Sequence, residues 1–266
     1  MGHLRSLARR AAYSLGLAGA WYRLRDARRS FGGEPPAIRD GDQIPVPPRS
    51  LINLVAGDVE PDAFVKSGER KLRALAAAVD RNGGDFRKFA RILDFGCGCG
   101  RLARHARTFT DASLFGCDRN SALIAWCAKN LEGTFVRNGP HPPLDFPDSH
   151  FDVVYLLSVF THWRLTTQNE WLPELRRIVR PGGLALVSFH DEDHLGLAAA
   201  GLERADLLAK GFVVCNDAAE GTNFISTFQS CDFARRQFAA HFEIVEIASS
   251  RASGLGHGLA VLCKPP

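Results

Sequence analysis

Apolar residues between positions 90 and 190 follow two different spacings, which alternate along the chain. Short continuous apolar runs predict buried strands, and apolar residues three and four positions apart predict amphipathic helices. Because strands and helices alternate, the pattern predicts right-handed βαβ units and a parallel sheet. The predicted strands span residues 90–95, 113–117, 134–137, 151–157 and 184–189. The predicted helices span residues 100–108, 121–130 and 168–179.

Residues 191–228 break this alternation, and we expect them to form an insertion that covers the substrate. A helix at 230–241 and two strands, 242–247 and 259–263, follow the insertion. The connection between these two strands is too short for a crossover helix, so the strands should be antiparallel. The predicted fold is α/β: a Rossmann-like, doubly wound, seven-stranded sheet, mostly parallel with an antiparallel last strand. The elements predicted inside the insertion are a helix at 196–210 and a short extended pair at 212–215 and 224–226.

The first part of the chain has a different pattern. Residues 4–29 carry an apolar stripe at helical spacing flanked by arginines, which predicts a basic amphipathic helix. Residues 31–50 are rich in glycine and proline and predict a linker. A further helix should begin near Pro61 and end at Asn82. The predicted division is an N-terminal helical extension with its linker, 1–50, and a main domain, 51–266.

Charge is unevenly distributed: residues 1–40 carry a net charge of +5, and the rest of the chain is near neutral at −1. Arginines that continue to Arg29, with Gly16 and Gly19 inside a short apolar segment, argue against a secretory signal. Two interpretations stay open for residues 1–30: contact with the same domain or a partner subunit, or contact with an anionic membrane surface. No extended basic face indicates nucleic acid, and no apolar run has the ~18–20 residues of a membrane span.

The seven cysteines do not form a disulfide or zinc pattern. Cys97 and Cys99 are a C-x-C pair, but no second pair or histidine follows at zinc spacing. Several cysteines fall in predicted strands or glycine loops, where cysteine behaves as a small hydrophobic residue. We therefore expect reduced, buried thiols in a cytoplasmic protein.

The stretch Arg91–Arg101 (RILDFGCGCGR) is a predicted strand that runs into glycines at positions 96, 98 and 100. Glycine allows a backbone to approach a ligand closely and to take positive φ. A strand, a glycine turn and the start of a helix together form a nucleotide pocket in a doubly wound sheet. This stretch is the strongest indication of a ligand site in the sequence.

Two acids indicate what kind of nucleotide would bind. The dinucleotide fingerprint G-x-G-x-x-G would place its third glycine at position 101, which is occupied by Arg101. Asp94 lies two residues before the first glycine, where it would repel a pyrophosphate but suit a cation. Asp118 ends the second strand, where a carboxylate can accept hydrogen bonds from both ribose hydroxyls. The pattern favours an adenosine with a positively charged, amino-acid-like tail.

The segment Leu93–Gly100 resembles the first motif of the class I S-adenosylmethionine (SAM)-dependent methyltransferases. Three later motifs are similar in the same order: the second-strand acid, the start of the fourth strand and the turn before strand five. They lie at Gly116–Asp118, Phe146–Tyr155 and Leu175–Gly183. The resemblance implies a SAM-dependent methyltransferase domain over residues 51–266. Residues 44–90 and Ser158–His162 also resemble a bacterial subgroup of small-molecule methyltransferases linked to glycan or natural-product pathways.

The resemblance also implies roles by position. Asp94 would hold the ammonium group of SAM, Asp118 its ribose hydroxyls, and Arg119 would flank the adenine. Asn138 stands where the family commonly carries an acid for adenine N6, and its amide oxygen can accept the same hydrogen bond. Ser158 would lie near the methionine and the methyl group. The implied cofactor-binding residues are Asp94, Gly96, Cys97, Gly98, Gly100, Asp118, Arg119, Asn138 and Ser158.

Methyl transfer requires alignment of the reacting groups, and an oxygen or nitrogen acceptor can also require a base. The candidate catalytic residues follow strands four and five: His162, His190 and Asp191. His162 is equally well explained as a wall residue beside Trp163. The stretch His190–His194 (HDEDH) allows a divalent-metal site as in catechol-type methyltransferases. Adjacent acids on a loop are more often solvated, so we predict no metal.

The leading hypothesis is a SAM-dependent methyltransferase that acts on an oxygen or nitrogen atom of a small polar or sugar-containing acceptor. The alternative is a SAM-binding protein without methyl transfer, acting as a sensor or scaffold. An NAD-linked oxidoreductase is disfavoured by Arg101. The sequence leaves the acceptor, the pathway and the oligomeric state open.

Overall fold

The computed structural model describes residues 44–57, 59–215 and 225–266. The predicted helix at 4–29 and most of the predicted linker lie outside the described residues. Their contact with a membrane or a subunit therefore stays a prediction. None of the helices in the described ranges combines the length and apolar character needed to cross a bilayer.

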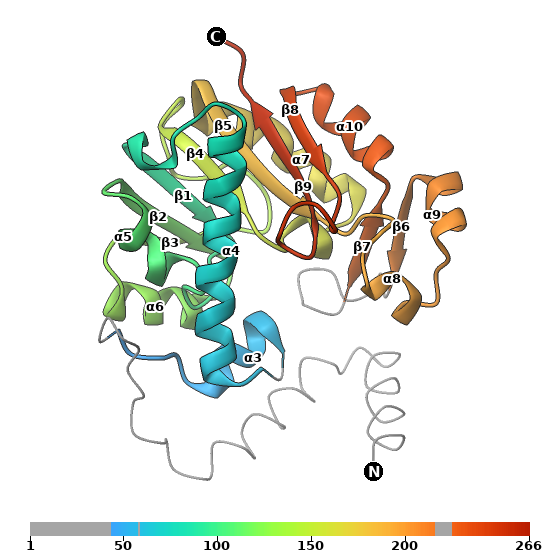
Figure 1. Ribbon diagram of the computed structural model, residues 1–266. Helices are drawn as coiled ribbons and strands as arrows, with labels where there is room; N and C mark the ends of the chain where they lie inside the picture. The colour runs from blue at the N-terminus through green and yellow to red at the C-terminus, as the bar shows by residue number, and fades with distance from the viewer. Residues whose placement is uncertain (1–43, 58, 216–224) are drawn as a thin grey trace, which may run out of the picture.

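A seven-stranded sheet forms the centre of the molecule (Figure 1), in the order β3-β2-β1-β4-β5-β9-β8. Neighbours from β3 to β5 are parallel, whereas β9 is antiparallel to both β5 and β8. The predicted α/β class, with a doubly wound sheet and an antiparallel last strand, is confirmed. The strands are β1 (Arg91–Phe95), β2 (Ser113–Asp118), β3 (Thr134–Arg137), β4 (Phe151–Leu156), β5 (Val179–Phe189), β8 (Glu243–Ala248) and β9 (Gly258–Cys263).

Helices cover both faces of this sheet. Successive residues of a strand point to opposite faces, so Ile92 packs with α4 (Pro61–Arg81) while Leu93 packs with α7 (Leu165–Ile178). Figure 1 shows α4 in front of the sheet and α7 behind it. Two further helices complete the layers, α6 (Ser121–Asn130) and α10 (Cys231–Ala239). Apolar side chains on both faces of the central strands form the buried core, as is usual in α/β domains.

A short helix that the sequence did not predict, α3 (Arg49–Ala56), lies before α4. Its Ile52 is fully buried in a cluster with Phe64 of α4 and Cys99 of the glycine stretch. The helix is eight residues long, so its apolar stripe is too brief for a periodicity argument. Packing against the glycine stretch, rather than its own propensity, stabilises it.

Two predicted helices are shorter than expected. The segment predicted as a helix at 100–108 forms a 3-10 turn, η2 (Ala103–His105), and a single turn, α5 (Ala106–Phe109). The predicted helix at 196–210 is divided into α8 (Gly196–Ala199) and α9 (Arg204–Lys210). Gly201 between α8 and α9 has a φ of +74°, which ends the first helix.

The insertion at 191–228 forms a small antiparallel sheet of β6 (Phe212–Cys215) and β7 (Ser226–Gln229). It stands beside the main sheet in Figure 1, with α8 and α9 next to it. His190 at the end of β5 forms an isolated bridge with Phe228, and the amide of Gln229 donates to its carbonyl at 2.9 Å. The hydroxyl of Thr227 donates to the carbonyl of Trp163 at 2.8 Å. The insertion is thus attached to the ends of β4 and β5.

Candidate functional site

The glycine loop, residues 96–100, leaves β1 through three glycines with positive φ: 73° at Gly96, 57° at Gly98 and 74° at Gly100. The amides of Gly96 and Cys97 both donate to the carbonyl of Cys117, at 2.8 and 3.0 Å. These bonds hold the loop against the end of β2. Left-handed backbone at three alternate positions explains why the stretch requires glycine.

The space beside these glycines is filled by neighbouring protein. A Cβ on Gly96 would lie 2.5 Å from a methyl of Val159, and one on Gly98 would lie 2.6 Å from a methyl of Val55. A Cβ on Gly100 would meet Leu131. The missing side chains therefore allow three different segments to close around the loop. Val55 belongs to α3, so α3 is a wall of the site.

Asp118 is fixed by the backbone on both sides. One carboxylate oxygen accepts from the amide of Gly98 at 3.0 Å, and the other accepts from the amide of Asn120 at 2.8 Å. Burial raises the pKa of Asp118, and these two hydrogen bonds lower it. The side chain thus couples the end of β2 to the glycine loop, as expected for a carboxylate that binds ribose.

Asn138 follows β3 and lies beside Asp118, whose carbonyl accepts from the amide of Asn138 at 3.2 Å. The Asn138 side chain is 9% exposed, and its Nδ2 donates to the carbonyl of Gly139 at 2.8 Å. Its Oδ1 is buried and has no hydrogen-bond partner among the described residues. A buried acceptor without a donor is costly, so this atom is suited to receive an N–H group from a ligand. Arg119 lies exposed at the same edge.

Asp94 lies on β1, two residues before the loop, and is 3% exposed. Its Oδ2 is a second buried acceptor without a partner in the described part of the chain. Burial raises the pKa of Asp94 to about 7, although the nearby Tyr155 hydroxyl and the charge of Arg101 both act to lower it. A cation bound at Oδ2 would favour the ionised carboxylate.

Ser158 follows β4 and has a φ of +61°, a strained backbone for a residue with a side chain. Its amide donates to the hydroxyl of Ser188 at 2.8 Å, which holds this conformation. Its own hydroxyl lies 3.4 Å from Nδ1 of His257. Strain of this kind is found where backbone geometry serves a site.

His162 ends the turn η3 (Phe160–His162). Its Nδ1 donates to the carbonyl of Ile225 at 2.8 Å, which leaves Nε2 as the proton acceptor. Burial lowers the pKa of His162, so the imidazole is neutral near neutral pH. His162 therefore contacts the insertion through Nδ1 and can accept a proton at Nε2.

His190 and Asp191 follow β5, but their side chains have different surroundings. Burial lowers the pKa of His190 to about 2, so its imidazole is a weak base. Asp191 is fully buried, and one carboxylate oxygen accepts from the amide of Ser250 at 2.6 Å. Asp191 thereby anchors the β8–β9 connection. A catalytic role for either residue stays a prediction.

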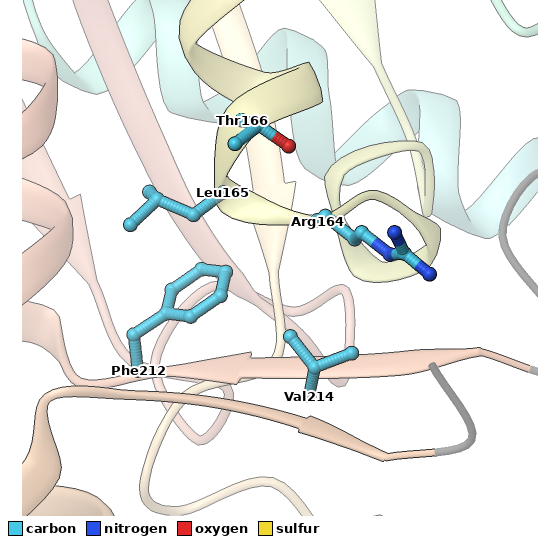
Figure 2. Close-up of a pocket in the computed structure, with 5 residues that line it drawn as sticks. All are labelled: Arg164, Leu165, Thr166, Phe212 and Val214. Carbon is cyan, nitrogen blue, oxygen red and sulfur yellow. The ribbon is translucent and has the colours of Figure 1, made fainter. Parts of the chain in front are cut away.

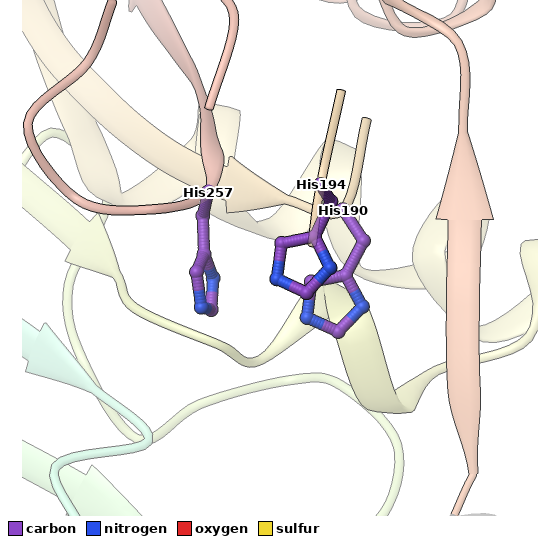
Figure 3. A group of neighbouring side chains, drawn as sticks. All are labelled: His190, His194 and His257. Carbon is purple, nitrogen blue, oxygen red and sulfur yellow. The ribbon is translucent and has the colours of Figure 1, made fainter. Parts of the chain in front are cut away.

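The sequence pattern did not indicate His257, which precedes β9. Because Phe189 pairs with Gly258 across β5 and β9, the residues just beyond that pair, His190 and His257, lie next to each other. Their ring centroids are 5.0 Å apart, and the ring of His194 lies 3.9 Å from that of His190. Figure 3 shows the three rings close together. Only the antiparallel placement of β9 brings its beginning to the carboxyl ends of the parallel strands.

A hollow of about 380 Å³ opens between the start of α7 and β6 (Figure 2). None of the glycine-loop residues lines it. The lining is mostly apolar, and its charged residue is Arg164, which lies two residues after His162 in the chain. Its lining residues are Arg164, Leu165, Thr166, Phe212 and Val214.

Comparison with known proteins agrees with this geometry. Residues 93–187 match the family described as "Methyltransferase domain". Solved structures with the same fold include a SAM-dependent methyltransferase from Mesorhizobium loti, at 16% identity and a TM-score of 0.54 over 71% of this chain and 97% of that one. Residues 93–187 are thus a methyltransferase domain, in a chain with the fold of class I SAM-dependent methyltransferases. The glycopeptide N-methyltransferase MtfA, solved with SAM, has the same fold at 15% identity and a TM-score of 0.53, covering 75% and 94% of the two chains.

Curated relatives of this chain match only in part. A sterol 24-C-methyltransferase of Aspergillus fumigatus is 32% identical over 101 residues, which are 35% of this chain and 26% of that protein. A sterol 24-C-methyltransferase of Neurospora crassa is 30% identical over 129 residues, 46% of this chain and 32% of that protein. The chain thus spans about a third or less of the length of these relatives.

SAM is the cofactor of this family, and the residues present fit it. Two buried acceptors, Oδ2 of Asp94 and Oδ1 of Asn138, have no partner within the described ranges. They stand on either side of Asp118 in the strand order β1, β2, β3. An adenosyl group with a cationic amino acid has donors in the same order: the ammonium, the ribose hydroxyls and the adenine amine.

Proposed function

We propose that this methyltransferase transfers a methyl group from SAM to an oxygen or nitrogen atom of a small polar or sugar-containing acceptor. The two unpartnered buried acceptors at Asp94 and Asn138, with Asp118 between them, carry the proposal. When bound, SAM supplies a methyl group on a sulfonium, which leaves as a neutral thioether. Asp94 holds the ammonium, Asp118 the ribose hydroxyls, and Asn138 the adenine amine.

The acceptor side of the site is polar. Ser158, His162 and His190 follow β4 and β5, and His257 joins them from β9. Hydroxyl and imidazole groups position polar acceptors by hydrogen bonds, and a polar molecule is therefore favoured over a long lipid. The relatives named for sterols match less than half of this chain, so their acceptor is not transferred to it.

His162 is the best-supported base among the three candidates. Its bond to Ile225 fixes the tautomer with a proton acceptor at Nε2. Base catalysis works best with a pKa near the working pH, and burial takes His190 far below that range. Asp191 is engaged with the Ser250 amide. We therefore propose that Nε2 of His162 accepts the proton of the acceptor hydroxyl or amine.

The test is methyl transfer from radiolabelled SAM to a panel of sugars, phenols, amines and carboxylates. The variant His162→Gln keeps a side-chain donor for Ile225 but removes the base. It should lower kcat by roughly 10²–10⁴-fold while S-adenosylhomocysteine binds as tightly as before. Binding of SAM without turnover on every acceptor would instead support the sensor or scaffold alternative. Absence of SAM binding would overturn both hypotheses.

A further inference from the structure

Three imidazoles from separate parts of the chain lie close together where the parallel strands of the main sheet have their carboxyl ends (Figure 3). His190 follows β5, His194 lies four residues later, and His257 precedes β9. One ring nitrogen from each lies within 4.8 Å of the other two. We propose that this histidine triad, His190, His194 and His257, binds one divalent transition-metal ion. The sequence alone predicted no metal here, because adjacent acids on a loop are more often solvated, and it did not point to His257.

The environment of His190 suits a metal ligand. Its Nδ1 is buried and has no hydrogen-bond partner in the part of the chain described. A buried ring nitrogen without a partner is available to ligate a metal ion.

The arrangement selects a class of ion. Imidazole nitrogens suit zinc, cobalt, nickel and iron(II), whereas magnesium and calcium prefer oxygen ligands. Zinc–nitrogen bonds of about 2.0–2.1 Å require nitrogens about 3.4 Å apart, so the rings must approach by roughly 1 Å. The amide of Gly196 donates to Nδ1 of His194 at 3.0 Å, and ligation by that ring would give up this bond. Three protein ligands leave a fourth position open, as in catalytic zinc sites.

The triad lies beside Ser158, where the proposed function places the acceptor, and the open position would face that side on this basis. Nδ1 of His257 lies 3.4 Å from the hydroxyl of Ser158, at the end of β4. An ion there would act as a Lewis acid on an acceptor hydroxyl and lower its pKa. The site itself is independent of methyl transfer, because the triad needs no SAM to form.

Two charged groups near the triad have opposite effects on a dication. Asp191 follows His190 directly, and its carbonyl accepts from the amide of His194 at 3.2 Å, so its carboxylate would attract the ion. Lys71 of α4 reaches the connection that carries His257, and its positive charge would repel the ion. Its ammonium donates to the carbonyl of Leu255 at 3.2 Å, on the same connection that carries His257. Neutralising Lys71 should therefore tighten metal binding.

The experiment measures metal binding to the full chain without SAM. Metal-free protein is titrated with Zn²⁺ by calorimetry and with Co²⁺ by visible absorption. We expect one ion per chain with micromolar affinity or better, and no comparable binding of Mg²⁺. His194→Ala and His257→Ala should each weaken Zn²⁺ binding about a hundredfold or more, because each removes one of three ligands. Lys71→Met should tighten it several-fold.

His241→Ala is the matched control. His241 precedes β8, whose first residue Glu243 pairs with Cys263 at the opposite edge of the sheet. The His241→Ala variant should bind Zn²⁺ as the native protein does. Circular dichroism tests whether each variant folds. If His257→Ala is unfolded, zinc binding by His194→Ala alone decides the test. Absence of stoichiometric binding, retention in both triad variants, or equal loss in the control would each overturn the proposal. None of these outcomes bears on SAM binding, which is measured separately.

Discussion

His190 and His257 lie at the ends of neighbouring antiparallel strands, with ring centroids 5.0 Å apart and ring planes at 68°. The register that pairs Phe189 with Gly258 causes this contact. The glycine loop leaves β1 at the same edge of the sheet. Ser158 lies between the glycine loop and the two histidines. Its hydroxyl contacts His257, and the side chain of the next residue, Val159, packs against Gly96. The glycine loop and the histidine triad therefore meet at Ser158.

Removal of the Asp118 carboxylate should abolish most cofactor binding. Asp118→Ala removes hydrogen bonds to the ribose hydroxyls and the support of the Gly98 amide. Hydrogen bonds to charged groups are worth about 1.5–3 kcal/mol, so affinity for S-adenosylhomocysteine should fall at least tenfold. Calorimetry measures this change. Asp111→Ala, which alters an exposed acid before β2, serves as the control and should bind normally. Equal affinity in the two variants would contradict the assignment.

The unpartnered Oδ1 of Asn138 should recognise the adenine amine. Asn138→Ala should weaken S-adenosylhomocysteine roughly three- to tenfold, the usual worth of one hydrogen bond. The hypoxanthine analogue, which carries oxygen in place of the amine, should bind both proteins alike. Asn138→Asp keeps an acceptor and should retain affinity for the adenine compound. A loss of the same size for both ligands would show that Asn138 acts only through the fold.

The positions of the proposed cofactor residues could be predicted from sequence because their signals are local. Asp94 and the glycines lie within one stretch, and the apolar periods fix where β1 and β2 end. Carboxyl ends of parallel strands share an edge, so Asp118 and Asn138 could be placed beside the loop. The strand order confirmed that placement.

The parts that sequence did not predict depend on long-range packing. His257 reaches the site only because β9 inserts between β5 and β8 in the antiparallel direction. Antiparallel pairing of the last two strands was expected, but the position of β9 in the sheet was not. Likewise, α3 is too short for periodicity and is held by the burial of Ile52 against Phe64 and Cys99. Both features require the assembled sheet.

Cofactor binding should depend on pH through Asp94. Its pKa is raised to about 7 by burial, so below pH 7 the unliganded protein holds a proton there. The ammonium of S-adenosylhomocysteine requires the carboxylate, so binding releases that proton. Affinity should therefore fall about tenfold for each pH unit from pH 7 to about pH 5. Calorimetry in buffers of different ionisation enthalpy measures both the affinity and the released proton.

Stability of the unliganded protein should change in the opposite sense. The folded pKa of Asp94 lies above its ordinary value of 3.8, so the folded state binds the extra proton between these values. Protonation of Asp94 therefore stabilises the folded state fully at about pH 4. This contribution to the free energy of unfolding is lost as pH rises toward 7 and does not change further above pH 7. Asp94→Asn should remove this slope from unfolding curves and the pH dependence from ligand binding. Binding that does not vary with pH in the native protein would refute the role of Asp94.

Gly98 should be required for two separable reasons. Its φ of +57° costs about 1–2 kcal/mol for any residue with a Cβ, and that Cβ would lie 2.6 Å from a methyl of Val55. Gly98→Ala should therefore lower the free energy of unfolding and displace α3 from the loop. Adding Val55→Ala removes the clash but leaves the backbone strain, so it should restore part of the lost cofactor affinity. Thermal unfolding and calorimetry separate the two effects.

Gly83→Ala is the matched control for the strain alone. Gly83 has a φ of +83° at the end of α4, and nothing lies within 4 Å of the position its Cβ would take. Its substitution should cost about 1–2 kcal/mol of stability and leave S-adenosylhomocysteine affinity unchanged, because it lies outside the site. If Gly98→Ala behaved like Gly83→Ala in both measurements, contact between α3 and the glycine loop would have no part in cofactor binding. A larger loss of affinity in Gly98→Ala, partly recovered by Val55→Ala, would identify α3 as a functional wall of the pocket.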